Sequence, residues 1–226
     1  NCALGAWVAT PETAHARGRR ASGGTAGAAA LLLGGLLPVD GAWALEIAVP
    51  VAPPPNTRWP VPGGEDIHFA STVDGGYAIE VATSGTKTFS AAVGGTSPLN
   101  SLIAGGDGST VLHANVNTVG LQLYDDALVL RGSVTLTSAV GEIAFESTVD
   151  GAQALNVNAG LSTRILGNVG ATSALSSLSV SGLTVLGANV YTMGSQSYGG
   201  TVVLAGNAAL SSLGGGNITF GSPIPD

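Results

Sequence analysis

An internal repeat constrains this chain more than any other feature of its sequence. The segment Ser-Thr-Val-Asp-Gly occupies residues 71–75 and returns unchanged at residues 147–151, a spacing of 147 − 71 = 76. Apolar residues around the two copies match as well, for example Ile67 with Ile143. Short repeat units cannot bury an apolar face alone, so they must stack on copies of themselves. The repeat therefore predicts a solenoid.

Two complete units and the start of a third account for residues 65–226. We place the units at residues 65–140, 141–215 and 216–226, and Phe220 in the third lies 220 − 145 = 75 positions after Phe145. From this incomplete unit we expect the chain to be a piece of a longer repeat protein. Its end coils would then contact further repeats, and an isolated fragment with open strand edges should aggregate.

Charged residues are scarce in this chain. They make up 9% of the 226 residues, against about 25% in typical soluble domains, whereas glycine occurs 35 times. The net charge of −7 offers no basic face for phosphates, so we do not expect nucleic acid as a partner. Cys2 is the only cysteine, so the chain can form neither an internal disulfide nor a cysteine metal site.

Residues 1–44 have the pattern of a targeting segment. Arginines at positions 17, 19 and 20 precede a short apolar run at 28–37, and Ala42-Trp43-Ala44 fits a cleavage site after Ala44. The apolar run is too short for a membrane span, which needs about 20 residues. The order predicts a secretory signal peptide. A Gly/Ala-rich arm without a targeting role is the alternative.

Residues 45–64 form a proline-rich segment. Six prolines between Ile47 and Gly64 favour extended polyproline II and are incompatible with the interior of a sheet. We predict a linker, or a strand that caps the repeats.

Strand signals dominate residues 65–226. Runs of Val, Ile, Leu and Thr with period two arrive about every eight to ten residues between Gly, Asn and Asp clusters. About three strands would form a coil of about 25 residues, so the repeat would hold about three coils. We predict an all-β, right-handed parallel β-helix with about three strands per coil. A Greek-key sandwich remains the alternative, because it has similar strand spacing. The residues expected to face inward are Ile67, Phe69, Ile79, Val81, Leu99, Leu102, Ile143, Phe145, Leu155, Val157, Leu175 and Leu178.

Residues 64–224 resemble the strand repeats of large bacterial exoproteins. The shared patterns are I-x-F-x-S-T-V-D-G, then A-[IL]-x-V, then V-G-x-T-S-x-L-x-S-L at residues 93–102 and 169–178. Residues 196–204 are similar to a Q-x-Y-x-G-x-V-x-L segment, of which the first unit keeps Gln122, Tyr124 and Leu130. These patterns are typical of filamentous-haemagglutinin-like and autotransporter-like adhesins. The resemblance implies export from a Gram-negative cell, a right-handed β-helix and a role in attachment or aggregation.

One pair of carboxylates is the best catalytic candidate in the sequence. β-Helix enzymes that act on acidic polysaccharides need clustered carboxylates and cations, but the cations that follow Ala44 are scattered: Arg58, Lys87, Arg131 and Arg164. The best pair is Asp125-Asp126, whose counterparts in the second unit are Gly199 and Gly200. We expect a solvated β-turn there, with a catalytic pair as the alternative.

Other candidate ligands are dispersed. His68 and His113 correspond to Ala144 and Gly187, and two separate outward-facing histidines do not make a metal site. Asp74 and Asp150 occupy identical Asp-Gly turns, for which calcium binding is the alternative. Two further patterns, the glycine-rich stretch 105–108 and the sequon at 217–219, occur once each. We predict no catalytic, cofactor-binding or metal residues.

These observations together predict a secreted, non-catalytic β-solenoid. It would be part of a large surface exoprotein that acts in adhesion or aggregation or as a rigid stalk, secreted or held at the surface of a Gram-negative cell. Its partners would be outer-membrane export machinery and surface glycans or proteins of a host or neighbouring cell. The alternatives are a carbohydrate-active β-helix enzyme, either a polysaccharide lyase or a hydrolase, and an inert spacer.

Overall fold

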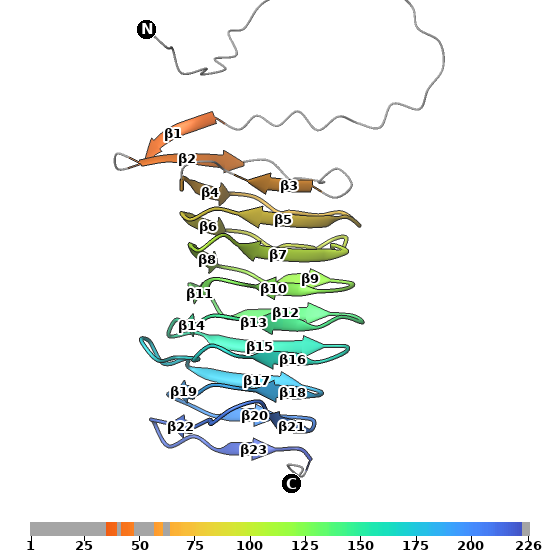
Figure 1. Ribbon diagram of the computed structural model, residues 1–226, viewed down its shortest axis with the longest axis vertical. Coiled ribbons are helices and arrows are strands. Elements are labelled where there is room, and N and C mark those ends of the chain that lie inside the picture. The colour runs from red at the N-terminus through yellow and green to blue at the C-terminus, as the bar shows by residue number, and fades with distance from the viewer. Residues whose placement is uncertain (1–34, 40–41, 48–56, 61–63, 223–226) are drawn as a thin grey trace, which may run out of the picture.

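The computed structural model is an all-β solenoid of about seven turns (Figure 1). It describes residues 35–39, 42–47, 57–60 and 64–222, and side chains within 64–222. Successive coils stack along the long axis, and each coil offers a strand, or a single bridged residue such as Val93 or Val169, to each of three sheets. Within the described residues no helix has the length and apolarity needed to cross a membrane.

The three sheets, which we name A, B and C, run along the solenoid side by side. Sheet A contains β1 (Gly35–Val39), β2 (Ala42–Ile47), β4 (Asp66–Phe69), β6 (Thr86–Phe89), β8 (Ser109–Leu112), β11 (Ala127–Leu130), β14 (Val149–Asp150), β19 (Val190–Thr192) and β22 (Leu210–Ser212). Sheet B contains β9 (Val116–Thr118), β12 (Val134–Ser138), β15 (Ala154–Ala159), β17 (Ser177–Ser181), β20 (Gln196–Tyr198) and β23 (Ile218–Phe220). Sheet C contains β3 (Thr57–Pro60), β5 (Ala78–Ala82), β7 (Ser101–Gly105), β10 (Gln122–Tyr124), β13 (Ile143–Phe145), β16 (Thr163–Ile165), β18 (Thr184–Leu186) and β21 (Val202–Leu204).

Parallel pairing between successive coils confirms the predicted solenoid and rules out the Greek-key sandwich. In sheet C, for example, Gln122 pairs with Leu102 of the coil before it and with Ile143 of the coil after it. The one antiparallel pair among the described strands is β1 with β2. Every inner coil therefore has its backbone groups satisfied on both sides, which leaves open edges only at the ends.

The coils are shorter than predicted. Along sheet A, Lys87 pairs with Thr110 and Thr110 with Leu128, so the coils measure 110 − 87 = 23 and 128 − 110 = 18 residues. The estimate of 25 residues and three coils per repeat was wrong. It overestimated the coil length because turns of two or three residues connect many of the strands.

The sequence repeat is out of phase with the coil. Counted through the sheets, Ile143 lies eleven strand positions after Ile67, and three positions make one coil. One repeat therefore spans three and two-thirds coils, and a residue and its counterpart one repeat later lie on different sheets. Ile67 is in sheet A but Ile143 is in sheet C, and Ile79 is in sheet C but Leu155 is in sheet B.

The interior is a continuous apolar column. All the residues predicted to face inward are buried, each no more than 2% exposed. Aromatic rings of successive coils stack on one another, with ring centroids 4.6 Å apart for Phe69 and Phe89 and 5.5 Å for Tyr124 and Phe145. Alternate residues face inward in each strand, so period two in the sequence was sufficient to find this set.

The N-terminal strands bear on the predicted domain boundaries. β2 pairs with β4 in sheet A, and β3 pairs with β5 in sheet C, so the sheets continue into the segments predicted as signal and linker. The predicted cleavage site after Ala44 lies inside β2. The proposed boundaries at residues 44 and 64 stay predictions, and most of the predicted signal peptide lies outside the described residues.

Candidate binding groove and buried charge pair

Asp126 lies inside the solenoid and forms an ion pair with Lys87. The two side chains are 3% and 0% exposed, and Lys87 Nζ contacts Asp126 Oδ2. Thr110 Oγ1 donates a hydrogen bond to Asp126 Oδ1 at 2.8 Å, and Lys87 Nζ donates one to the carbonyl of Thr83 at 3.0 Å. The expected solvated turn was therefore wrong for Asp126, although Asp125 beside it is exposed. A carboxylate held in this way cannot reach a substrate outside the coil.

The second unit lacks both charges of this pair. Thr163 takes the place of Lys87 and Gly200 that of Asp126, while Thr184 is the counterpart of Thr110. Thr163 and Thr184 are paired in register and buried, and neither hydroxyl has a hydrogen-bond partner within the described residues. From the sequence, Lys87 is one of several scattered cations. The joint loss of Lys87 and Asp126 in the second unit is the signal that could have paired them.

Asp74 and Asp150 each hold a loop of the next coil. Asp150 Oδ1 accepts hydrogen bonds from the backbone N–H groups of Thr172 and Ser173, at 2.8 and 2.9 Å. Asp74 Oδ1 does the same for residues 96 and 97, at 2.8 and 3.1 Å. The repeated Val-Asp-Gly and Thr-Ser patterns are thus two halves of one contact between coils. This use of the carboxylates accounts for the motif without calcium.

The stretch 105–108 is a tight turn against the preceding coil. Gly106 and Asp107 have positive φ values of 104° and 66°, and a Cβ on Gly108 would lie 1.9 Å from the carbonyl oxygen of Gly85. The second unit lacks two residues at this turn, which changes the repeat spacing from 76 to 196 − 122 = 74. Close packing of backbones explains the glycines here.

The two histidines lie apart on the outside of the solenoid. His68 Nε2 forms a hydrogen bond with Ser90 Oγ at 2.8 Å, and His113 is exposed. Among residues 64–222, no three side chains of His, Cys, Asp or Glu gather closely enough to hold a metal ion. The sequon threonine, Thr219, lies in β23.

The Q-x-Y pattern forms a polar network inside the coil. Gln122 Nε2 donates a hydrogen bond to the carbonyl of Thr137 at 2.7 Å, and Tyr124 Oη donates to Gln122 Oε1 at 3.1 Å. Gln196 and Tyr198 repeat this arrangement in the second unit. Burial raises the pKa of both tyrosine hydroxyls well above the ordinary value of about 10. These residues stabilise the coil and are not available to a ligand.

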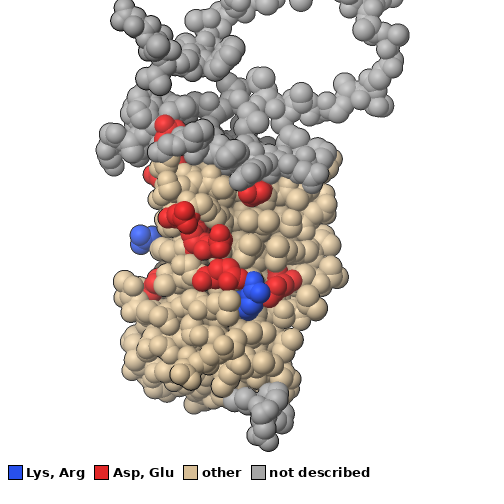
Figure 2. Space-filling model, viewed as in Figure 1, with Lys and Arg blue, Asp and Glu red and all other residues tan. Residues whose placement is uncertain are grey.

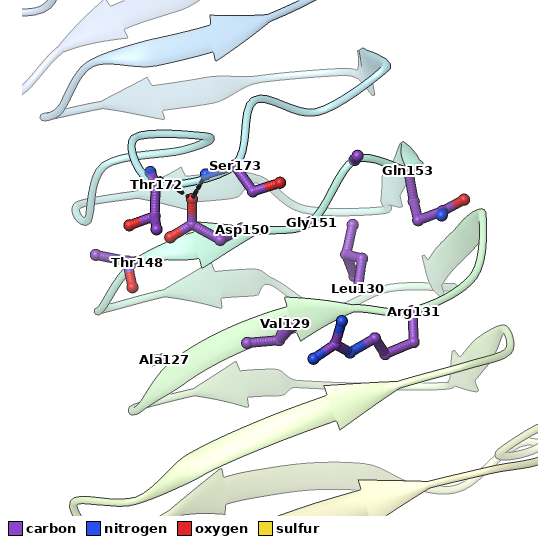
Figure 3. Close-up of a pocket in the computed structure, with 11 residues that line it drawn as sticks. Ala127, Val129, Leu130, Arg131, Thr148, Asp150, Gly151, Gln153, Thr172 and Ser173 are labelled. Atoms are coloured by element: carbon purple, nitrogen blue, oxygen red, sulfur yellow. Dashed lines mark hydrogen bonds between the residues drawn. The ribbon is translucent and has the colours of Figure 1, made fainter.

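A groove of about 600 Å³ opens between the coils of β11 and β14, beside the loop at residues 172–173 of the next coil (Figure 3). Its lining residues are Ala127, Val129, Leu130, Arg131, Thr148, Asp150, Gly151, Ala152, Gln153, Thr172 and Ser173. Arg131 is exposed, and none of the ion pairs found within residues 64–222 involves it. Arg131 and Gln153 can donate hydrogen bonds to a polar ligand. Asp150, the one carboxylate of this lining, is already bound to the loop at residues 172–173.

The remaining charges lie toward the N-terminal end of the solenoid (Figure 2). Arg164 forms ion pairs with Glu142, at 3.6 Å, and with Glu146. No Asp, Glu, Lys or Arg occurs between Arg164 and Asp226. The C-terminal coils therefore have a surface without charge.

Comparison with known proteins gives one match, at the N-terminus. Residues 1–39 match the family described as the Extended Signal Peptide of Type V secretion system. No curated protein and no solved structure matches the chain. The match confirms the predicted export signal and indicates secretion by the type V route of Gram-negative bacteria, which involves outer-membrane export machinery. With the β-solenoid, it makes the chain similar to the exported part of an autotransporter-like protein.

Proposed function

We propose that the chain is a segment of a secreted, non-catalytic solenoid. It acts at the cell surface in adhesion or aggregation, or as the stalk that carries another domain. The observation that carries the proposal is the unbroken stack of parallel coils around a filled interior. Such a stack is stiff along its axis and presents long faces to a partner.

The positions of the candidate catalytic groups favour a non-catalytic role. Of the pair Asp125-Asp126, one carboxylate is buried against Lys87, so the two cannot act together on a bound sugar. Asp74 and Asp150 hold loops, and Arg164 is paired with glutamates. Glycoside hydrolysis needs a pair of carboxylates that flank the scissile bond. The groove beside Arg131 offers only Asp150, which is already bound to a loop.

Secretion by live cells can test the proposal. Cells that export the full chain should attach to surfaces, or to one another, more than matched cells with an empty export system. If neither attachment nor clumping changes, the inert spacer is the better account. Turnover of acidic polysaccharides by the purified chain, lost in Asp125→Asn, would instead support the enzyme.

A further inference from the structure

The outer face of sheet B carries rows of uncharged polar side chains. Two columns of outward residues run along it, each linked from coil to coil by the strand register. The first column is Thr135, Asn156, Ser179, Ser197 and Thr219, and the second is Asn117, Thr137, Asn158 and Ser181. We name these nine residues the polar face. All are exposed or half-buried, and every one is Asn, Ser or Thr.

The repeat alone does not produce this face, because the repeat is out of phase with the coil. The column Asn156, Ser179 and Ser197 of sheet B corresponds to Glu80, Ile103 and Leu123 of the first unit, which form a column in sheet C. The outward residues changed from charged and apolar to polar and neutral when their sheet changed.

The inward neighbours of these residues did not change in the same way. Leu102 and Leu178 are identical, as are Gln122 and Gln196, and Tyr124 and Tyr198. The type of an inward side chain depends on its position in the repeat, because the interior of each coil packs alike. The type of an outward side chain depends instead on the sheet that carries it.

Two of the three first-unit residues of the polar face show the reverse change. Asn117 corresponds to Tyr191 of β19 in sheet A, and Thr135 corresponds to Ala209, directly before β22 of that sheet. The third, Thr137, corresponds to Ser211 and stays polar. The polar face is thus uniform along its described length although its members occupy different repeat positions. Contact with water alone would not explain why the outward residues become polar on sheet B in particular, because water surrounds every side of the solenoid.

Most of these side chains have hydrogen-bonding groups to spare. Six of them, Thr135, Thr137, Asn156, Asn158, Ser179 and Ser197, form no side-chain hydrogen bond within residues 64–222. Hydroxyls and amides both donate and accept. Parallel strands place successive members of a column about 4.8 Å apart, and the two columns are about 6.8 Å apart because they alternate along each strand.

We infer that the polar face binds an extended, uncharged polysaccharide that lies along the solenoid axis. The members of each column recur about every 4.8 Å along the axis, so a chain of sugars laid along the axis meets a new Asn, Ser or Thr at every coil. The absence of Lys and Arg from the face gives no attraction for a uronic acid or a sulfate. This inference rests on the proposed adhesive function and names its ligand class.

Binding of the purified, full secreted chain to amorphous cellulose is the direct test, with soluble polygalacturonate as the acidic counterpart. We expect the chain to co-sediment with cellulose and not to bind polygalacturonate. Because no charge takes part, the affinity should change less than about twofold between about 0.1 M and 1 M salt. Failure to co-sediment, or binding that salt abolishes, would overturn the inference.

The first unit supplies the variants for this test. The triple variant is Asn156→Glu/Ser179→Ile/Ser197→Leu. It gives the polar face the residues found at the equivalent first-unit positions in sheet C, so the coil can accept them. Affinity for cellulose should fall about tenfold or more, because buried sugar hydroxyls lose their partners. The control is Ile103→Ser/Leu123→Ser on sheet C, which should leave affinity unchanged. Equal effects of the two variants would refute the assignment to sheet B.

Attachment of whole cells separates this inference from the proposed function. If cells attach but the purified chain does not bind cellulose, the adhesive function is supported and the polysaccharide assignment is wrong. If cells secreting the triple variant also lose attachment to cellulose-coated surfaces, both stand together.

Discussion

The two repeat units have the same strand pattern and the same inward packing, but only the first has a pair of charged side chains in its interior. The first unit buries Lys87 against Asp126, and the second has Thr163 and Gly200 at the same places. The Gln–Tyr network and the Asp-held loops are the same in both. Both units keep the Asp-held loops and the Gln–Tyr network, but only one has an internal ion pair. The coil therefore depends on the hydrogen bonds and can form with or without the ion pair.

Loss of one partner of the ion pair should produce the largest effect. Lys87→Thr alone or Asp126→Gly alone leaves a buried charge without its counter-charge and should lower the free energy of unfolding by about 3–5 kcal/mol. The double variant reproduces the second unit and should lie within about 1 kcal/mol of the parent. Urea unfolding of the full chain measures all three. A double variant as unstable as either single one would show that the units do not tolerate the same interior.

High pH should destabilise both units through their shared tyrosines. Burial raises the pKa of Tyr124 and Tyr198, so above about pH 10 the folded state keeps protons that the unfolded state has lost. Stability is therefore complete below about pH 10 and should fall above it by about 1.4 kcal/mol per pH unit for each tyrosine.

Urea midpoints between about pH 9 and 11 measure this slope. Tyr124→Phe and Tyr198→Phe should each remove an equal part of it, since each ring occupies the same network. An unchanged slope in either variant would mean that the hydroxyl of that unit ionises without loss of stability.

Removal of an Asp that holds a loop should have a smaller effect, equal in the two units. Asp74→Ala and Asp150→Ala each free two backbone N–H groups and should cost about 1–2 kcal/mol, as the loss of a helix N-cap does. Hydrogen exchange of the freed amides at residues 96–97 or 172–173 should quicken in the matching variant only. Equal exchange in parent and variant would contradict the contact.

The buried threonines should give the smallest effect, of opposite sign in the two units. Thr184→Val removes a buried hydroxyl that has no partner within residues 64–222 and should raise the free energy of unfolding by about 1 kcal/mol. Thr110→Val removes the hydrogen bond to Asp126 and should lower it by about 1–2 kcal/mol. The same substitution in equivalent places thus tests whether the units differ only in their charges. Thermal melting of both variants is sufficient, and shifts of the same sign would refute the distinction.

Much of the fold was predictable, because the period-two pattern of apolar residues and the sequence repeat both indicate which side chains pack inward. The buried residues, such as Ile67 and Leu178, and the parallel stacking follow directly from these patterns. The coil length did not follow. The strand spacing differed too: β9 begins at residue 116 and β10 at residue 122, closer than the predicted eight to ten residues. The three-residue run that contains Asn117 carries a weak strand signal.

The candidate sites were less accessible to sequence reasoning. Lys87 and Asp126 are 126 − 87 = 39 residues apart. They meet only because β6 and β11 lie two coils apart in sheet A, and Asp126 directly precedes β11. The groove beside Arg131 arises where a loop held by Asp150 overhangs the preceding coil, and nothing in the local sequence reports that overhang.

By itself, the sequence determined that the chain is a secreted stack of β-coils with a known inward set, because export signals and packing periodicity are properties of short segments. Only the tertiary structure decided which residues share a face. The number of residues per coil sets the rotation of each repeat about the axis, and that number depends on the turns and strand pairing of every coil together. The uniform polar face of sheet B is visible only once that rotation is known.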